Sequence, residues 1–306
     1  MSAASETSER REAIDAFAAI LMVGLTFTWG LNQVAVKLST VGYSPVFLTL
    51  MRSAVAAILV YGWCRVRGIA LFERDGTLVP GLIVGLLFGA EFVFVFFGLD
   101  LTTVARGTLM LNTMPFWVLI GSHFFLNDRI TTAKLTGLAM AFAGVALVFS
   151  DRLSLPDPAA LRGDVMCLLA GGFWGATLIV IKSTKLANAG AEKTLLYQLV
   201  VSALMAVPLL PLGGPVLRAV SPLATGALAF QAVFVVAFTY LLFFWLVRRY
   251  PAAGLSSFAF LTPVFGVLCG GLLLGEPLSH RIILALALIA AGLVVVNRPV
   301  RRSIPG

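Results

Sequence analysis

Two ionisable residues lie inside long apolar segments, where a charge needs compensation. Glu91 is the one carboxylate well inside an apolar run, and Arg52 lies roughly seven residues, or about 10 Å of helix, into another. An ionisable group at membrane depth costs at least ~2.5 kcal/mol unless it meets water, a partner or a substrate. Glu91 could bind a substrate ammonium or carry a proton, or it could form a structural pair with Arg52 or Arg106. Arg52 could hold a substrate carboxylate or serve a structural role at its helix end.

Two tryptophans occupy matching places in two related segments, and each is followed by glycine. Trp29 and Trp174 lie nearer the middle of their apolar runs than the ends, which argues against the interfacial position that indole rings often take. Asn32 lies one turn beyond Trp29, and Thr177 lies one turn beyond Trp174. The pattern predicts a substrate cavity lined from two sides by indole rings, with polar groups close by.

The residues around Glu91 follow helical spacing. Phe88 and Phe92 share its face of the expected helix, so both are predicted to line the same site. A separate ridge of small residues suits tight packing against a neighbouring helix, and it consists of Gly81, Gly85 and Gly89. The segment is therefore predicted to have one packing side and one aromatic side that carries the carboxylate.

Prolines interrupt two of the apolar runs at equivalent places. Pro115 and Pro263 each remove a backbone donor and free a carbonyl one turn earlier, which must then meet protein or cavity water. Asn112 precedes Pro115 by one turn and could satisfy that gap or contact substrate. The two prolines are either hinges or plain helix kinks.

Metal and cofactor chemistry find little support. The cysteines Cys64, Cys167 and Cys269 form no CxxC pair, and the histidines His123 and His280 are far apart, so neither a disulfide framework nor a metal site is indicated. A Walker-type GxxxxGK[ST] sequence is also absent. We therefore expect no cofactor, no metal and no ATP site in this chain.

The composition requires a membrane setting for these residues. Of 306 residues, 59% are hydrophobic and 12% are charged, whereas soluble domains carry about 25% charged residues. Strands of a barrel would alternate in polarity, and these apolar runs are continuous. The predicted fold class is an all-α polytopic membrane protein with ten transmembrane helices, at residues 16–38, 45–64, 78–98, 103–126, 131–150, 163–185, 192–212, 222–247, 251–274 and 279–297.

Basic residues distribute unevenly over the two faces that ten crossings define. Fifteen Lys and Arg fall on the face of the termini and six on the opposite face, so the positive-inside rule places both termini in the cytoplasm. Orientation in the bilayer thus explains the net charge of +8 better than nucleic-acid binding does. We expect cytoplasmic tails at 1–15 and 298–306, an extracytoplasmic linker at 151–162 and a location in the inner membrane.

The two halves of the chain resemble each other at a nearly constant offset. Residues 29–37 match residues 174–182 at a shift of 145, and residues 112–115 match residues 260–263 at a shift of 148. Each half holds five spans, an odd number, so the second half enters the membrane from the opposite side. Inverted repeats over 16–150 and 163–297 are typical of alternating-access transporters, with the substrate site between the halves.

These residues carry a family resemblance over about 16–297. The Trp-Gly pairs, Arg52 followed by an Ala-rich stretch, the proline-containing helices and the glycine-containing fifth helix of each half resemble the EamA repeat of the drug/metabolite transporter superfamily. The phenylalanine-rich third helix and the overall length are similar to the YddG-type aromatic amino-acid exporters. The resemblance implies export of amino acids with bulky or aromatic side chains.

The leading functional hypothesis is a secondary transporter that exports small zwitterionic metabolites, with amino acids as its substrates. Alternatives are transport of another small metabolite or a drug, a channel, and an intramembrane enzyme. The enzyme is disfavoured because no GxSxG elbow surrounds Ser256 and Ser257. Since both halves lie in one chain, a monomer can be complete, although a dimer is not excluded.

Overall fold

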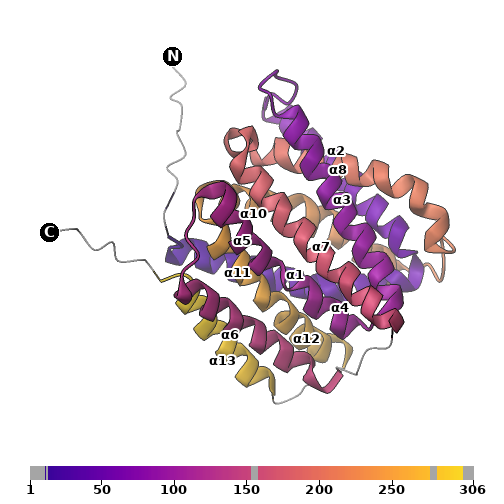
Figure 1. Ribbon diagram of the computed structural model, residues 1–306. Helices are drawn as coiled ribbons and strands as arrows, with labels where there is room; N and C mark the ends of the chain where they lie inside the picture. The colour runs from indigo at the N-terminus through magenta and orange to yellow at the C-terminus, as the bar shows by residue number, and fades with distance from the viewer. Residues whose placement is uncertain (1–10, 12, 153–157, 276–280, 299–306) are drawn as a thin grey trace.

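The computed structural model describes residues 11, 13–152, 158–275 and 281–298, which form a bundle of helices (Figure 1). Within these residues nine helical segments are long and apolar enough to cross a membrane, and Arg281–Val296 is a shorter apolar helix. The predicted all-α, ten-helix membrane fold is confirmed. Most of both predicted tails, residues 153–157 of the predicted linker 151–162, and His280 lie outside the described residues.

The first half of the chain supplies five spans, of which the fourth is divided. Its elements are α1 (Ala16–Gly42), α2 (Pro45–Val66), α3 (Leu78–Leu101), α4 (Val104–Leu111), α5 (Met114–Leu126), α6 (Thr132–Phe149) and the short η1 (Ser150–Arg152).

The second half repeats this order with more interruptions. Its elements are α7 (Pro158–Ser183), η2 (Lys185–Asn188), α8 (Ala191–Leu209), η3 (Leu210–Gly213), α9 (Pro222–Ala229), η4 (Phe230–Thr239), α10 (Tyr240–Arg249), α11 (Ala252–Ser257), η5 (Phe258–Phe260), α12 (Leu261–Leu274) and α13 (Arg281–Val296).

Three of the spans contain irregular backbone in the structure. The fourth span divides into α4 and α5 beside Pro115, and the ninth passes through the 3₁₀ turn η5 just before Pro263. Proline removes a backbone donor, so the helix tightens or ends beside it. The eighth span contains the ten-residue π-helix η4, which no proline explains. The interruptions expected at Pro115 and Pro263 are thus present, whereas the π-helix in the eighth span was not predicted.

The principal helix contacts join the two halves rather than neighbours within one half. α6 packs along α13, α3 along α7 and α8, α1 along α12, and α2 along α8. Figure 1 shows α6 and α13 side by side at one edge of the bundle and α3 beside α7 and α8 at the opposite edge. The hydrophobic core therefore lies between the two repeats.

The contact between α6 and α13 carries the symmetry of the duplication. A Cβ atom on Gly144 would lie 2.8 Å from the Ala285 carbonyl oxygen, and one on Gly292 would lie 2.5 Å from the Gly137 carbonyl oxygen. The shift of 148 that relates the repeats maps Gly144 onto Gly292 and Gly137 onto Ala285. The two contacts are therefore one contact seen from each repeat, as a two-fold relation between the halves requires.

The predicted glycine ridge on α3 is confirmed as a packing surface. It lies directly against α8, where added Cβ atoms would collide with three side chains in turn, namely Tyr197 at Gly81, Val201 at Gly85 and Met205 at Gly89. Small residues let the two helices approach closely. The opposite side of α3 is thereby left to face the interior.

The first and last helices meet at the same end of the bundle. A Cβ on Gly254 would contact both Ile14, just before α1, and Asn297, just after α13. The Arg11 backbone amide also donates to the Arg249 carbonyl at 2.8 Å. We call this end the terminal face.

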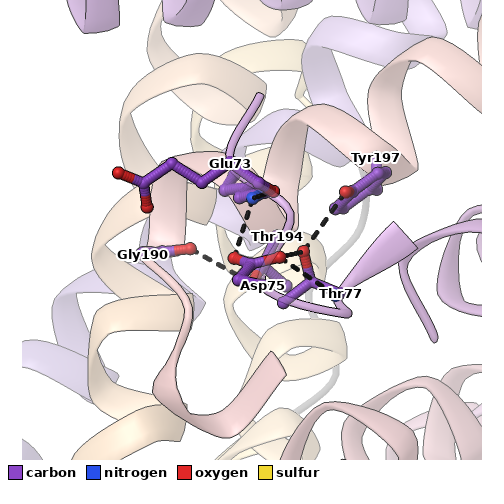
Figure 2. Close-up of polar contacts among 7 residues, drawn as sticks. Glu73, Asp75, Thr77, Gly190, Thr194 and Tyr197 are labelled. Carbon is purple, nitrogen blue, oxygen red and sulfur yellow. Dashed lines mark hydrogen bonds and ion pairs between the residues drawn. The ribbon is translucent and has the colours of Figure 1, made fainter. Parts of the chain in front are cut away.

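A polar cluster ties the loop before α3 to the start of α8 (Figure 2). The Lys193 ammonium donates to the Asp75 carboxylate at 2.8 Å, and the Thr77 hydroxyl donates to the same carboxylate at 2.6 Å. Thr77 also lies 3.3 Å from the Tyr197 hydroxyl. The Lys193 ammonium and the Thr77 donors hold the pKa of Asp75 well below its usual range.

We expect Asp75→Asn to lower the thermal unfolding temperature of the purified protein at pH 7. The pKa of Asp75 is lower in the folded than in the unfolded chain, so its stabilisation is complete above the unfolded pKa of about 4 and is lost as pH falls through the folded pKa. Unfolding followed from pH 7 downward should show a constant difference from wild type that shrinks only below about pH 4.

The matched control is Glu73→Gln, because the Glu73 side chain is exposed and only its backbone carbonyl accepts from Lys193. An equal effect of both substitutions would contradict the assignment of stability to the Asp75 carboxylate.

Candidate functional site

A cavity of about 230 Å³ lies between the two repeats. All eight residues predicted to bind substrate line it, together with Arg52, and these residues are Trp29, Asn32, Phe88, Glu91, Phe92, Asn112, Trp174 and Thr177. Both halves contribute walls, since α1 to α4 meet α7, α8, α10, η5 and α12 around this space. The sequence patterns thus converge on one place in the fold.

Two opposite charges face this cavity without forming an ion pair. Glu91 and Arg52 are each 8% exposed, and within the described chain neither the Glu91 Oε2 atom nor the Arg52 Nε atom has a hydrogen-bond partner. The Arg52 guanidinium carbon lies 4.4 Å from the centre of the Phe92 ring, a cation–π contact. Arg106, which was weighed as a partner for Glu91, instead pairs with Asp164 on α7.

In the described part of the chain, most of the buried polar atoms that lack a hydrogen-bond partner belong to residues that line this cavity. Among the described residues, seven buried side-chain polar atoms lack a partner, and five of them belong to cavity residues. Besides Glu91 and Arg52, these are the Asn32 Oδ1, Gln198 Oε1 and Thr262 Oγ1 atoms. Buried polar groups are normally satisfied, because leaving one unpaired costs roughly 1–3 kcal/mol. The arrangement suits a polar, charged guest or water.

The two indole rings occupy related positions but differ in their contacts. Trp29 is 9% exposed, and its indole nitrogen donates to the Thr239 hydroxyl at 2.9 Å. Its ring also meets Tyr240 and Phe243 edge-on, at 6.0 and 5.2 Å between ring centres. Trp174 is partly exposed, and its indole nitrogen has no protein partner within the described chain. Trp29 is thus held by its neighbours through its indole nitrogen, whereas no such hydrogen bond within the described chain holds Trp174, which also lines the cavity.

The polar side chain of Asn112 hydrogen-bonds within its own helical turn and not to the Leu111 carbonyl that Pro115 leaves without its helical donor. Its side-chain amide donates to the Thr108 carbonyl at 2.8 Å, and its backbone amide donates to the same oxygen at 3.0 Å. Neither Pro115 nor Pro263 lines the cavity, but each lies within one turn of a residue that does. For Pro115 this residue is Asn112, between α4 and α5, and for Pro263 it is Thr262 in α12. Their role as hinges stays a prediction.

Sequence inspection overlooked much of the wall from the second half. Tyr240, Phe243 and Phe244 line the cavity from α10. The shift of 148 maps Phe92 onto Tyr240, so applying the repeat offset to the third helix would have found the first of them. The phenylalanines of η4 instead point outward, with Phe234 44% and Phe238 57% exposed. The π-helix hides this change of face from any pattern based on α-helical spacing.

Comparison with known proteins places this architecture. The EamA-like transporter family matches residues 16–150 and 161–298. A protein of Salmonella typhimurium named a probable amino-acid metabolite efflux pump is 26% identical, over 92% of this chain and 94% of its own length. The pseudopaline exporter CntI of Pseudomonas aeruginosa is 28% identical over 62% of this chain and 65% of its own. A crystal structure of 19% identity covers 92% of this chain and 98% of its own with a TM-score of 0.78, which supports the fold.

The indole contact of Trp29 yields a test of its positioning role. We expect Trp29→Phe and Thr239→Val each to destabilise the protein by about 1 kcal/mol, because each removes the buried hydrogen bond between α1 and η4. The double variant should cost less than the sum of the two, as a double-mutant cycle of thermal unfolding would reveal.

Trp174→Phe is the matched control. Its indole nitrogen has no protein partner within the described chain, so this variant should keep wild-type stability. Additive losses for Trp29 and Thr239 would show that their hydrogen bond contributes nothing to folding.

Proposed function

The chain belongs to the EamA-like transporter family, and from that premise we propose that it exports neutral amino acids, aromatic and other bulky ones, across the inner membrane by alternating access. The observation that carries the proposal is that Arg52 and Glu91 line one central cavity, and that each has a buried side-chain atom without a hydrogen-bond partner among the described residues. A zwitterion matches such a pair, with its carboxylate toward Arg52 and its ammonium toward Glu91. The charge bias of the loops supports a cytoplasmic location for both ends of the chain.

The remainder of the cavity favours a small molecule with an apolar part. Aromatic rings from both repeats surround the charges, notably Phe88, Trp174 and Phe243. The volume of about 230 Å³ is below the ~300–1,000 Å³ of pockets that hold drug-sized ligands. This size supports a metabolite rather than a drug as the substrate.

Alternating access accounts for a site that both repeats share. The cavity lies between halves of related structure, and Pro115 and Pro263 occupy equivalent places beside it. Movement of one repeat against the other around the site would expose it to each face in turn. The serines considered for catalysis, Ser256 and Ser257, donate to the carbonyls of Ala253 and Gly254 in their own helix, which is ordinary helix packing.

The central test of the function is counterflow in proteoliposomes. We expect unlabelled phenylalanine inside the vesicles to drive transient accumulation of labelled phenylalanine, with saturation and without ATP, because exchange needs only a shared site that alternates. Tryptophan, tyrosine and leucine should compete, and glycine should compete weakly, because it lacks apolar contact area. In the Trp174→Ala protein this competition should be abolished, while the yield of purified protein should stay at the wild-type level. Saturable exchange of a non-amino-acid metabolite alone would replace the proposed substrate class.

The role of Glu91 is tested by Glu91→Gln, which keeps size and hydrogen bonding but removes the charge. If Glu91 holds the ammonium, apparent affinity for amino acids should fall about tenfold to hundredfold, because a hydrogen bond to a charged group contributes about 1.5–3 kcal/mol. The amine-free analogue 3-phenylpropionate should be affected much less. If Glu91 carries a coupling proton, counterflow should survive while transport driven by a pH gradient is lost.

The control for this test is Glu73→Gln, which removes an exposed carboxylate outside the cavity. Should Glu91 serve only as a structural counter-charge for Arg52, its variant should be recovered in low yield, and adding Arg52→Gln should restore the yield. Normal yield with unchanged affinity and pH response would remove Glu91 from the site.

A further inference from the structure

A second and larger cleft opens at the terminal face, separate from the central cavity. It has a volume of about 980 Å³ and lies among the ends of α5, α7, α10 and α13 and the start of α11. Arg248 and Ile181 line it, each about one helical turn beyond a residue of the central cavity, Phe244 on α10 and Leu178 on α7. One turn corresponds to about 5.4 Å, so the cleft and the cavity are neighbours along the helix axes.

The cleft is strongly cationic. Five basic side chains line it, Arg129, Lys134, Lys182, Arg248 and Arg298. The single carboxylate among its described lining residues is Asp128, which is paired with Lys134. The field inside the cleft therefore favours anions and raises their local concentration.

Two buried polar atoms of the cleft lack a partner in the described chain. These are the Arg248 Nε and the Ser122 Oγ atoms, and Ser122 is only 1% exposed. With the five atoms of the central cavity they account for all seven such atoms. Two charged groups lie close enough for their fields to reach Arg248, the acidic Glu192 and the basic Arg249. Among the described residues Glu192 forms no ion pair with Arg248.

The positive-inside rule explains exposed cations at this face but not Arg248. Arg129 and Arg298 are exposed, and water solvates their charges. The Arg248 side chain is only partly exposed, and its enclosed Nε atom has no acceptor among the described residues, which costs free energy until an acceptor arrives. A planar carboxylate is a strong acceptor for a guanidinium, and the Ser122 hydroxyl lines the same cleft.

We propose that this cleft contains an anion subsite, built on Arg248 and Ser122, that receives the carboxylate of the substrate before the substrate enters the central cavity. The identity of the substrate rests on the proposed function, whereas the anion chemistry rests on the cleft. The phosphate of an anionic lipid headgroup has related chemistry, and the test below separates it from a carboxylate.

The test measures binding of 3-phenylpropionate, a carboxylate without an amine, to the purified full-length chain by calorimetry. Arg52→Gln is present throughout, so that the central cavity offers no cation to the probe. Adding Arg248→Gln should weaken binding about tenfold or more, since a charge-assisted hydrogen bond is lost. Ser122→Ala should weaken it less, because a neutral donor is lost.

Two matched variants remove the same charge nearby. Arg249 is adjacent in sequence but stacks on Trp245, at 4.1 Å from its ring centre, and does not line the cleft. Arg298 lines the cleft but is exposed. Arg249→Gln and Arg298→Gln should each change binding less than about threefold. An effect of either as large as that of Arg248→Gln would overturn the subsite, because the general field of the face would then suffice.

Lipid occupancy gives a different result. If phosphatidylglycerol in mixed micelles displaces 3-phenylpropionate from the chain with Arg248 intact, and if phenylalanine does not, the occupant is a lipid phosphate and the proposal is wrong. Should the Arg52→Gln protein fail to fold, the same comparison is made in the otherwise native chain through the KM for phenylalanine supplied at the terminal face. Arg248→Gln should then raise KM and leave kcat unchanged, and an unchanged KM overturns the subsite.

Failure of the subsite and failure of the proposed function are distinguishable. Arg248-dependent binding of the carboxylate without any amino-acid counterflow would keep the subsite and reject the transport substrate. Counterflow of amino acids with no dependence on Arg248 would do the reverse.

Discussion

Close backbone contact between the two repeats holds the bundle together, and the position of the central cavity depends on it. Gly30 of α1 lies directly against Phe265 and Gly266 of α12, and Gly175 of α7 lies against Trp117 and Met114 of α5. Inside a bilayer the hydrophobic effect does not favour helix–helix contact over helix–lipid contact. Association of the helices therefore relies on close packing at such small residues. Trp29 and Trp174 directly precede these glycines, and the two crossings therefore set where the indole rings lie.

Irregular backbone gathers beside the cavity rather than at the surface. The break between α4 and α5, the 3₁₀ turn η5 and the π-helix η4 all lie in spans that contribute lining residues or their supports. Irregular backbone at membrane depth is tolerated where protein or a cavity satisfies it. Thr239 links the end of η4 to Trp29, and Asn112 at the end of α4 lines the cavity.

Duplication makes the scaffold symmetric, but the chemistry of the cavity is not. The repeat offset places Gln198 opposite Arg52 in the two-fold scheme, and Thr239 opposite Glu91. Each charge therefore has a neutral, hydrogen-bonding counterpart in the other half. The cavity thus has a basic residue on one side and an acidic residue on the other, although the scaffold is symmetric. This arrangement is complementary to a zwitterion. At the terminal face, Arg248 extends this polarity toward one side of the protein.

The amino-acid sequence by itself determined the number of spans, the duplication and part of the cavity wall, because apolar length, charge bias and repeat offset can be read along the chain without knowledge of how the helices pack. Tertiary structure decided which of these residues have partners. From the sequence, Arg106 and Arg52 were equal candidates for an ion pair with Glu91. In the structure α4 packs against α7, and Arg106 forms its ion pair with Asp164. Tertiary packing likewise engaged the Trp29 indole and left that of Trp174 open, since a contact between residues 210 apart follows from how helices cross and not from spacing along one helix.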